Sequence, residues 1–192
     1  MTKTLTVSTK TLTVAKIGIA AGAILGLAFG TGAWAQTAPT PEKPITIKLG
    51  AFFPTGSRLK NGAGDTWFSA GAEYAVPSGA SQTLSPLLYL DYAGSNRHGV
   101  NADYVGVGPG VRYYLTPPGA STLTPYVGAG IGAYFLHASG FGSSSNKTQF
   151  GYRLNAGVEF SGSYLAEISY TDPSSLSGTR FSGFNLQVGA RF

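Results

Sequence analysis

The chain ends in Phe184-Asn-Leu-Gln-Val-Gly-Ala-Arg-Phe192, in which apolar and polar residues alternate. Successive side chains of a β-strand point to opposite faces, so this stretch predicts a strand with one apolar and one polar side. Its apolar side carries Phe184, Leu186, Val188, Ala190 and Phe192. A helix would require a period near 3.6 residues instead. The end of the chain therefore predicts a β-sheet protein.

Eight segments from residue 45 onward show this period of two, separated by clusters of Gly, Pro, Ser and Asn. Most have a length near the roughly 9–11 residues that a tilted strand needs to cross hydrocarbon. No long amphipathic helix fits after Ala35. We predict an all-β fold: an eight-stranded antiparallel, transmembrane up-and-down β-barrel over residues 45–192. The segments are 45–53, 66–76, 82–93, 101–115, 123–137, 148–160, 164–172 and 180–192.

The connections between these segments fall into two alternating groups. Short or tight ones lie at 77–81, 116–122 and 161–163, whereas those at 54–65, 94–100, 138–147 and 173–179 are mostly longer and richer in Arg, Lys, His and Asn. Outer-membrane barrels have short periplasmic turns and longer external loops. We therefore expect the second group to face outward and to carry any recognition of an extracellular ligand. An even number of strands places both termini on the periplasmic side.

The first 35 residues have the three regions of a signal peptide, which precedes the barrel. These are a basic leader with Lys3, Lys10 and Lys16, an apolar run over 17–29, and the small-x-small motif Ala33-Trp34-Ala35. The run is shorter than the roughly 20 residues of a membrane-spanning helix. We predict cleavage after Ala35 and export by the general secretory route. Residues 36–44 then form a Pro-rich periplasmic linker.

Composition supports a membrane location and excludes some partners. Charged residues make up only 11% of the chain, against about 25% in ordinary soluble domains. A surface that faces lipid explains this deficit. The net charge of +5 includes three leader lysines, so removal of the leader lowers it to +2. The basic balance therefore gives no argument for nucleic acid. Because cysteine is absent, the fold must be held without disulfides.

The charges on the polar faces are balanced, with four cations and four anions. A soluble barrel would show the same alternation, with its apolar faces inside and its polar faces outside. Charges on a solvated surface need not be equal in number, whereas buried charges must be paired. The balance therefore favours an interior position for the charges. Glycines also crowd the polar faces of 101–115 and 123–137, and they suit a narrow lumen. We therefore predict an interior charge network of Lys48, Glu73, Asp91, Arg112, Arg153, Glu159, Glu167 and Arg191.

The alternating C-terminal segment, which ends on Phe192, resembles the signature that the barrel-assembly machinery recognises in outer-membrane β-barrels. With the leader and the eight segments, the mature chain resembles the family of the outer membrane protein A transmembrane domain, the virulence-related X-type barrels and the opacity proteins. The stretches 104–114 and 125–134 are similar in style to strands of that family. The resemblance implies an integral protein of the outer membrane of a diderm bacterium, in contact with outer-membrane lipid.

One short motif raises the question of catalysis. His137-Ala-Ser139 resembles the site of outer-membrane lipid A deacylases, in which His activates a Ser nucleophile and an acidic residue orients the His. Gly140 follows where that family has Asn, and the matching acidic residue downstream is missing, because Glu159 lies too far along and faces inward. The motif therefore favours a His and a Ser at the edge of a loop. We predict no catalytic, cofactor or metal site.

The leading hypothesis is a non-enzymatic outer-membrane barrel with a structural or surface-interaction role and a mostly closed lumen. A narrow porin-like channel for small or apolar solutes is the second, although side chains just fill the interior of an eight-stranded barrel. A lipid A-modifying enzyme is the third. The loop cations fit anionic head groups or an extracellular partner, and they fit ordinary solvated residues equally well. These cations are Arg58, Lys60, Arg97, Lys147 and Arg180.

Overall fold

The structure, a computed structural model, describes residues 43–77, 83–97, 99–118, 121–140, 143–173, 175–176 and 179–192. The predicted signal peptide and residues 36–42 of the predicted linker lie outside the described residues.

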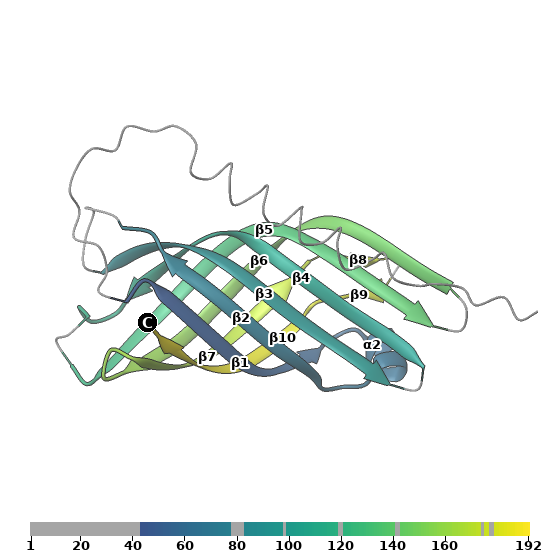
Figure 1. Cartoon of the computed structure of the whole chain (residues 1–192), viewed down its shortest axis with the longest axis horizontal. Coiled ribbons are helices and arrows are strands. Elements are labelled where there is room, and N and C mark those ends of the chain that lie inside the picture. Colours follow the sequence, from purple (N-terminus) through teal and green to yellow (C-terminus); the bar gives the residue numbers. More distant parts are fainter. Residues whose placement is uncertain are drawn as a thin grey trace, which may run out of the picture. The chain divides into compact units, whose positions relative to one another are not determined.

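Eight long strands close into a single antiparallel barrel, which confirms the predicted fold class (Figure 1). Each strand pairs with its neighbour in sequence, and β1 closes the barrel by pairing with the last strand, β10, from Thr46↔Arg191 to Pro54↔Gly183. The strands are β1 (Ile45–Pro54), β2 (Trp67–Ala75), β3 (Leu84–Arg97), β4 (Val100–Tyr114), β5 (Leu123–Gly140), β6 (Ser143–Phe160), β7 (Tyr164–Asp172) and β10 (Gly183–Arg191).

Two strand pairs are longer than the sequence predicted, and this corrects the loops expected at 94–100 and 138–147. β3 runs to Arg97 and β4 begins at Val100, while β5 and β6 are separated only by residues 141–142. The alternation of apolar and polar residues does not predict these strand ends, because polar residues occupy their outward positions. Pairing continues nevertheless, through Asn96↔Asn101 and Ser139↔Ser144, since the ladder satisfies backbone groups whatever the side chains are.

The long strands β3–β6 therefore extend beyond their neighbours as a protruding sheet. Pairing of β2 with β3 stops at Phe68↔Gly94, and pairing of β6 with β7 stops at Tyr152↔Asp172. Figure 1 shows the β3–β4 and β5–β6 ends at the same end of the barrel as helix α2. By the alternation of connections this is the outer end.

The connection at 54–65 contains a short helix, α2 (Ser57–Ala63), where the sequence predicted only a loop. Leu59 and Ala63 are spaced four residues apart and are the buried residues of this helix, so packing explains why such a short segment is helical. A two-stranded hairpin, β8 (Ser175–Leu176) with β9 (Thr179–Arg180), follows β7. In the described part of the chain, no helix has the length and apolar character to span a membrane.

The barrel carries apolar side chains outward and polar ones inward. Leu186 and Val188 are 57% and 65% exposed, whereas the side chain of Lys48 is fully buried. In water this arrangement would have two free-energy costs: a charge is removed from water, and large apolar side chains are exposed to water. Lipid around the barrel removes the second cost, because acyl chains solvate the apolar exterior, and ion pairs with Glu73 and Glu167 compensate the buried charge of Lys48.

Glycines inside the barrel make room for tyrosine rings from other strands. A Cβ atom added to Gly130 would lie 2.7 Å from Cε1 of Tyr89, and one added to Gly157 would lie 2.6 Å from Cζ of Tyr126. Real side chains do not approach so closely, so only glycine fits beneath these rings. The crowding that the glycine-rich polar faces predicted is thus a set of ring-over-glycine contacts.

The exposed position of Leu186 generates a test of the face assignment. Leu186→Arg should lower the free energy of unfolding by about 2–4 kcal/mol if the site lies near the middle of the hydrocarbon layer. Urea unfolding of the barrel in lipid vesicles measures this change, with Leu186→Met as the matched control. An arginine variant as stable as the control would show that this face does not contact lipid.

Candidate functional site

The structure places all eight predicted charges inside the barrel. They come from every long strand except β5, and each charged side chain is at most 5% exposed apart from that of Arg191, at 13%. Their balance of four cations and four anions leaves the interior network without net charge.

Glu73 and Glu167 lie at the centre of this network. Lys48 Nζ donates to both, at 2.7 Å from Glu73 Oε1 and 2.8 Å from Glu167 Oε1. Nη2 of Arg153 bridges the same two oxygens, at 2.8 and 2.6 Å. Arg112 completes the set through a hydrogen bond to Glu73 and a distance of 3.9 Å to Glu167. Each central carboxylate thus faces three cations.

The remaining charges attach to this centre in two branches. Nη1 of Arg153 reaches Oδ2 of Asp91 at 3.2 Å. On the other side, Glu159 accepts from Arg112 at 3.0 Å and from Arg191 at 2.8 Å. Two tyrosine hydroxyls also donate to the network, those of Tyr114 to Glu159 and of Tyr126 to Glu167. Hydrogen bonds to ionised groups are shorter and stronger than neutral ones. Four buried atoms of the network nevertheless have no hydrogen-bond partner among the described residues: Oδ1 of Asp91 and the Nε atoms of Arg112, Arg153 and Arg191.

An aromatic cluster fills the outer half of the lumen. The ring of Phe52 lies 5.4 Å from that of Trp67 and 5.4 Å from that of Tyr104, measured between centroids. Tyr134 and Phe181 are its other aromatic members, and all ten residues of the cluster are at most 5% exposed. Its remaining members are Leu59, Ala63, Ala93, Ala102 and Leu136. The sequence analysis missed this layer because it assigned the interior to polar residues. The available signal was that Phe52 shares the inward parity of Thr46 and Lys48.

Helix α2 closes the outer mouth over this cluster. Nε1 of Trp67 donates to the carbonyl of Gly64 at 2.9 Å, and Oγ of Ser95 donates to the carbonyl of Ala63 at 2.6 Å. Leu59 and Ala63 pack inward beneath the helix. Within the described residues, the ion-pair network and the aromatic cluster thus occupy the axis of the barrel one after the other.

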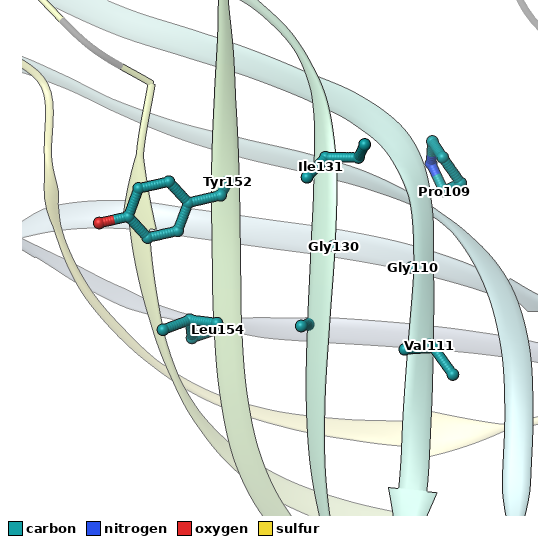
Figure 2. A pocket seen from close by; sticks show the side chains of 8 residues that line it. Pro109, Gly110, Val111, Gly130, Ile131, Tyr152 and Leu154 are labelled. Carbon is teal, nitrogen blue, oxygen red and sulfur yellow. The ribbon is translucent and has the colours of Figure 1, made fainter.

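The outer wall of β4, β5 and β6 carries a shallow groove (Figure 2). Figure 2 shows Ile131, Tyr152 and Leu154 standing on neighbouring strands beside it, and Ile131 is 67% exposed. The lining is apolar, so the groove suits contact with lipid and offers no chemistry. Its residues are Pro109, Gly110, Val111, Ala129, Gly130, Ile131, Tyr152 and Leu154.

His137 and Ser139 lie on β5 in the protruding sheet, not at the edge of a loop. An acidic residue upstream in the sequence lies across the sheet: Asp103 is the register partner of His137 and interacts with it electrostatically. On the other side, Nδ1 of His137 lies 2.5 Å from Oδ1 of Asn146. Among the described residues, however, no hydrogen bond joins Ser139 to His137.

The other predicted residues are placed as follows. Phe184, Leu186, Val188 and Phe192 of the proposed insertion signal point outward and are exposed, and Ala190 is half-buried. Ala33 and Ala35 lie outside the described residues. The described residues contain no group of three or more His, Asp or Glu that could hold a metal ion.

The loop cations lie at the outer end. Arg58 and Lys60 are exposed on α2, and Lys147 is exposed on β6. Arg97 lies 4.0 Å from Asp65, and Arg180 lies 3.3 Å from Asp172. The Arg97–Asp65 pair is exposed on both sides and contributes little to stability, and Arg180 is the exposed partner of its pair.

A closed eight-stranded barrel with an apolar exterior and a charge-paired lumen has the fold of the small outer-membrane β-barrels. The chain is similar to the crystal structure of Neisserial surface protein A (NspA), with 16% identity, a TM-score of 0.59, and coverage of 77% of this chain and 94% of that one. It is also similar to the outer membrane enzyme PagL, with 12% identity, a TM-score of 0.55, and coverage of 77% and 98%.

A further similar structure is the N-terminal β-barrel domain of OprF from Pseudomonas aeruginosa, with 17% identity, a TM-score of 0.47, and coverage of 77% of this chain and 97% of that one. No family model and no curated protein matches the chain. At these identities the likeness establishes the fold and leaves the function to be argued from the residues.

Arg153 provides the test of the network, because among the described residues it is the cation that contacts Glu73, Asp91 and Glu167 together. Arg153→Met should destabilise the barrel by about 3–5 kcal/mol, since it leaves the buried Asp91 without its ion-pair partner and removes one of the three cations that face Glu73 and Glu167. Urea unfolding in lipid vesicles measures the effect. Arg180→Met, which removes an exposed cation, is the control and should change stability by less than about 0.5 kcal/mol. Equal stability of both variants would contradict a buried, paired network.

Proposed function

We propose that the protein is an integral outer-membrane barrel with a closed lumen, no enzymatic activity, and a structural or surface-interaction role. It would reach this membrane by the general secretory route, lose its signal peptide, and be inserted by the barrel-assembly machinery, which would read the apolar face that ends at Phe192. The observation that carries the proposal is the contrast between a charge-paired interior and a long sheet that protrudes at the outer end.

The filled lumen supports a closed barrel over a porin-like channel. A conducting path would have to separate the cations from Glu73 and Glu167, and breaking buried pairs costs several kcal/mol. It would also have to displace α2 and the aromatic cluster beneath it. Both obstacles lie on the barrel axis, one behind the other.

Closure of the lumen predicts that purified protein in a planar lipid bilayer gives no persistent single-channel conductance. Arg153→Met should raise the frequency of brief openings, because it weakens the network without touching the outer surface. The control is Arg180→Met, whose side chain lies at the exposed outer end. Stable, uniform conductance steps from the unmodified protein would favour the channel instead.

The protruding sheet is the best candidate for a recognition surface, in place of the long loops that the sequence predicted. Residues 143–148 of β6 pair with β5 on one side. On the other side pairing with β7 begins only at Tyr152, and the described strands supply no ladder partner for 143–148, although the short strand β8 lies near β6. Pro173 follows the last residue of β7 and has no backbone N–H with which to extend the ladder. Unpaired strand edges accept an additional strand from an extended peptide. A surface-interaction role would use this edge.

A shortened hairpin tests this role. Replacing residues 138–145 by Asn-Gly would join the register partners His137 and Asn146 by a two-residue turn and remove the upper edge. Linear peptides selected by phage display on the full protein in nanodiscs should lose binding to the shortened variant. An equally long replacement of residues 138–145 by another polar strand sequence is the control, because backbone pairing would retain binding. Undiminished peptide binding to the shortened variant would exclude the edge.

The lipid-modifying alternative finds partial support in the residues around His137. Asp103 and Asn146 flank its ring, as an orienting group would. A nucleophile must also lie within hydrogen-bond reach of its base, and Ser139 makes no such bond to His137 in the described residues. We therefore retain the non-enzymatic role as the proposal.

A further inference from the structure

The outward face of the protruding sheet is polar, in contrast to the wall below it. One row of polar side chains crosses all four strands, and a second row crosses β4, β5 and β6. The upper row consists of the successive register partners Asn96, Asn101, Ser139 and Ser144, and the lower row contains Asp103, His137 and Asn146.

This face lies next to the lipid-facing wall on the same strands, on its outer side. The next row towards the membrane contains Tyr92, Val105 and Phe135, which are again register partners. Aromatic residues mark the boundary between hydrocarbon and head groups in outer-membrane barrels. The polar rows therefore begin where the head groups of the outer leaflet begin.

The chemistry of the face is that of uncharged hydrogen bonding. Amides and hydroxyls dominate it, and its one carboxylate, Asp103, lies beside His137. The nearby cations Arg97 and Lys147 have the opposite parity along their strands, so they are not part of this face. A face without Lys or Arg does not suit phosphate groups. It suits sugar hydroxyls, which both donate and accept.

One contact links two members of the face: Nδ1 of His137 lies 2.5 Å from Oδ1 of Asn146. An imidazole ring and a side-chain amide offer both donors and acceptors, so the pair suits a ligand whose groups do the same. Gly94 has no side chain, and an added Cβ would lie 2.9 Å from Cζ of Tyr92 and 3.1 Å from Cβ of Asp103. The Tyr92 ring therefore reaches up to the polar rows.

We infer that this face binds the uncharged sugar units of the glycolipid that surrounds the barrel in the outer leaflet. Continuity with the lipid-facing wall selects a membrane-anchored saccharide over a soluble one. The inference rests on the proposed outer-membrane location, but it does not depend on the strand edge of β6, because it uses side chains and not backbone groups.

The experiment compares nanodiscs that contain lipopolysaccharide with its core oligosaccharide, lipid A alone, or phospholipid alone. The lipopolysaccharide with core sugars should shift the side-chain amide NMR signals of Asn101 and Asn146 and raise the melting temperature of the barrel. The double variant Asn101→Ala/Asn146→Ala should lose the increase in melting temperature. Asn61→Ala, which removes an exposed amide on α2, is the matched control and should retain it.

Several results would overturn the inference. An equal response to lipid A and to core-bearing lipopolysaccharide would assign binding to phosphates or acyl chains. An equal response when free core oligosaccharide is added to phospholipid nanodiscs would assign it to a soluble glycan. Release of fatty acid that stops in Ser139→Ala would make the face a catalytic site.

Failure of the inference remains distinct from failure of the proposed function. A gel of boiled and unboiled samples shows whether each protein is folded in its nanodisc, because a folded barrel migrates differently before heating. A folded barrel without any response to core sugars would overturn the saccharide site alone. A chain that does not insert into any of the three nanodiscs would contradict the outer-membrane location itself.

Discussion

The rest of the structure depends on the need to neutralise two buried carboxylates. Glu73 and Glu167 lie where water cannot reach them, and each is surrounded by three cations. These long side chains must converge from several strands, so the lumen has to be narrow and the strands have to approach closely. Glycine under the tyrosine rings provides that approach. The exterior is then free to be apolar, because backbone pairing and interior charges hold the barrel together.

The interior is divided along its axis into two kinds of packing. Ion pairs fill the inner half, and the aromatic cluster around Phe52 and Trp67 fills the outer half beneath α2. The aromatic layer keeps water from the outer mouth away from the charges. A low local dielectric strengthens hydrogen bonds in a satisfied network and makes any unpaired group costly. The aromatic cluster thus contributes to the stability of the ion-pair network, although the two are in contact only where they meet along the barrel axis.

Alternation was sufficient to predict the strand number, the barrel and the side of each strand that faces lipid, because burial in a membrane barrel has a period of two. It could not predict the upper parts of β3–β6, where both faces are polar or small and only backbone pairing defines the strand. Nor could it place Asp103 beside His137, since this contact depends on the register between β4 and β5. The helix at 57–63 was missed because only Leu59 and Ala63 mark its buried side.

The wide distribution of the lumen charges over the strands also constrains how such a protein can evolve. Every hairpin of the barrel contributes at least one member of the ion-pair network, since β5 alone among the long strands supplies none. A chimera that borrows one hairpin from another barrel would lose at least one member of this network from its interior. Recombination within the barrel is therefore disfavoured. Substitutions of the lumen charges should instead accumulate as compensating changes on separate strands.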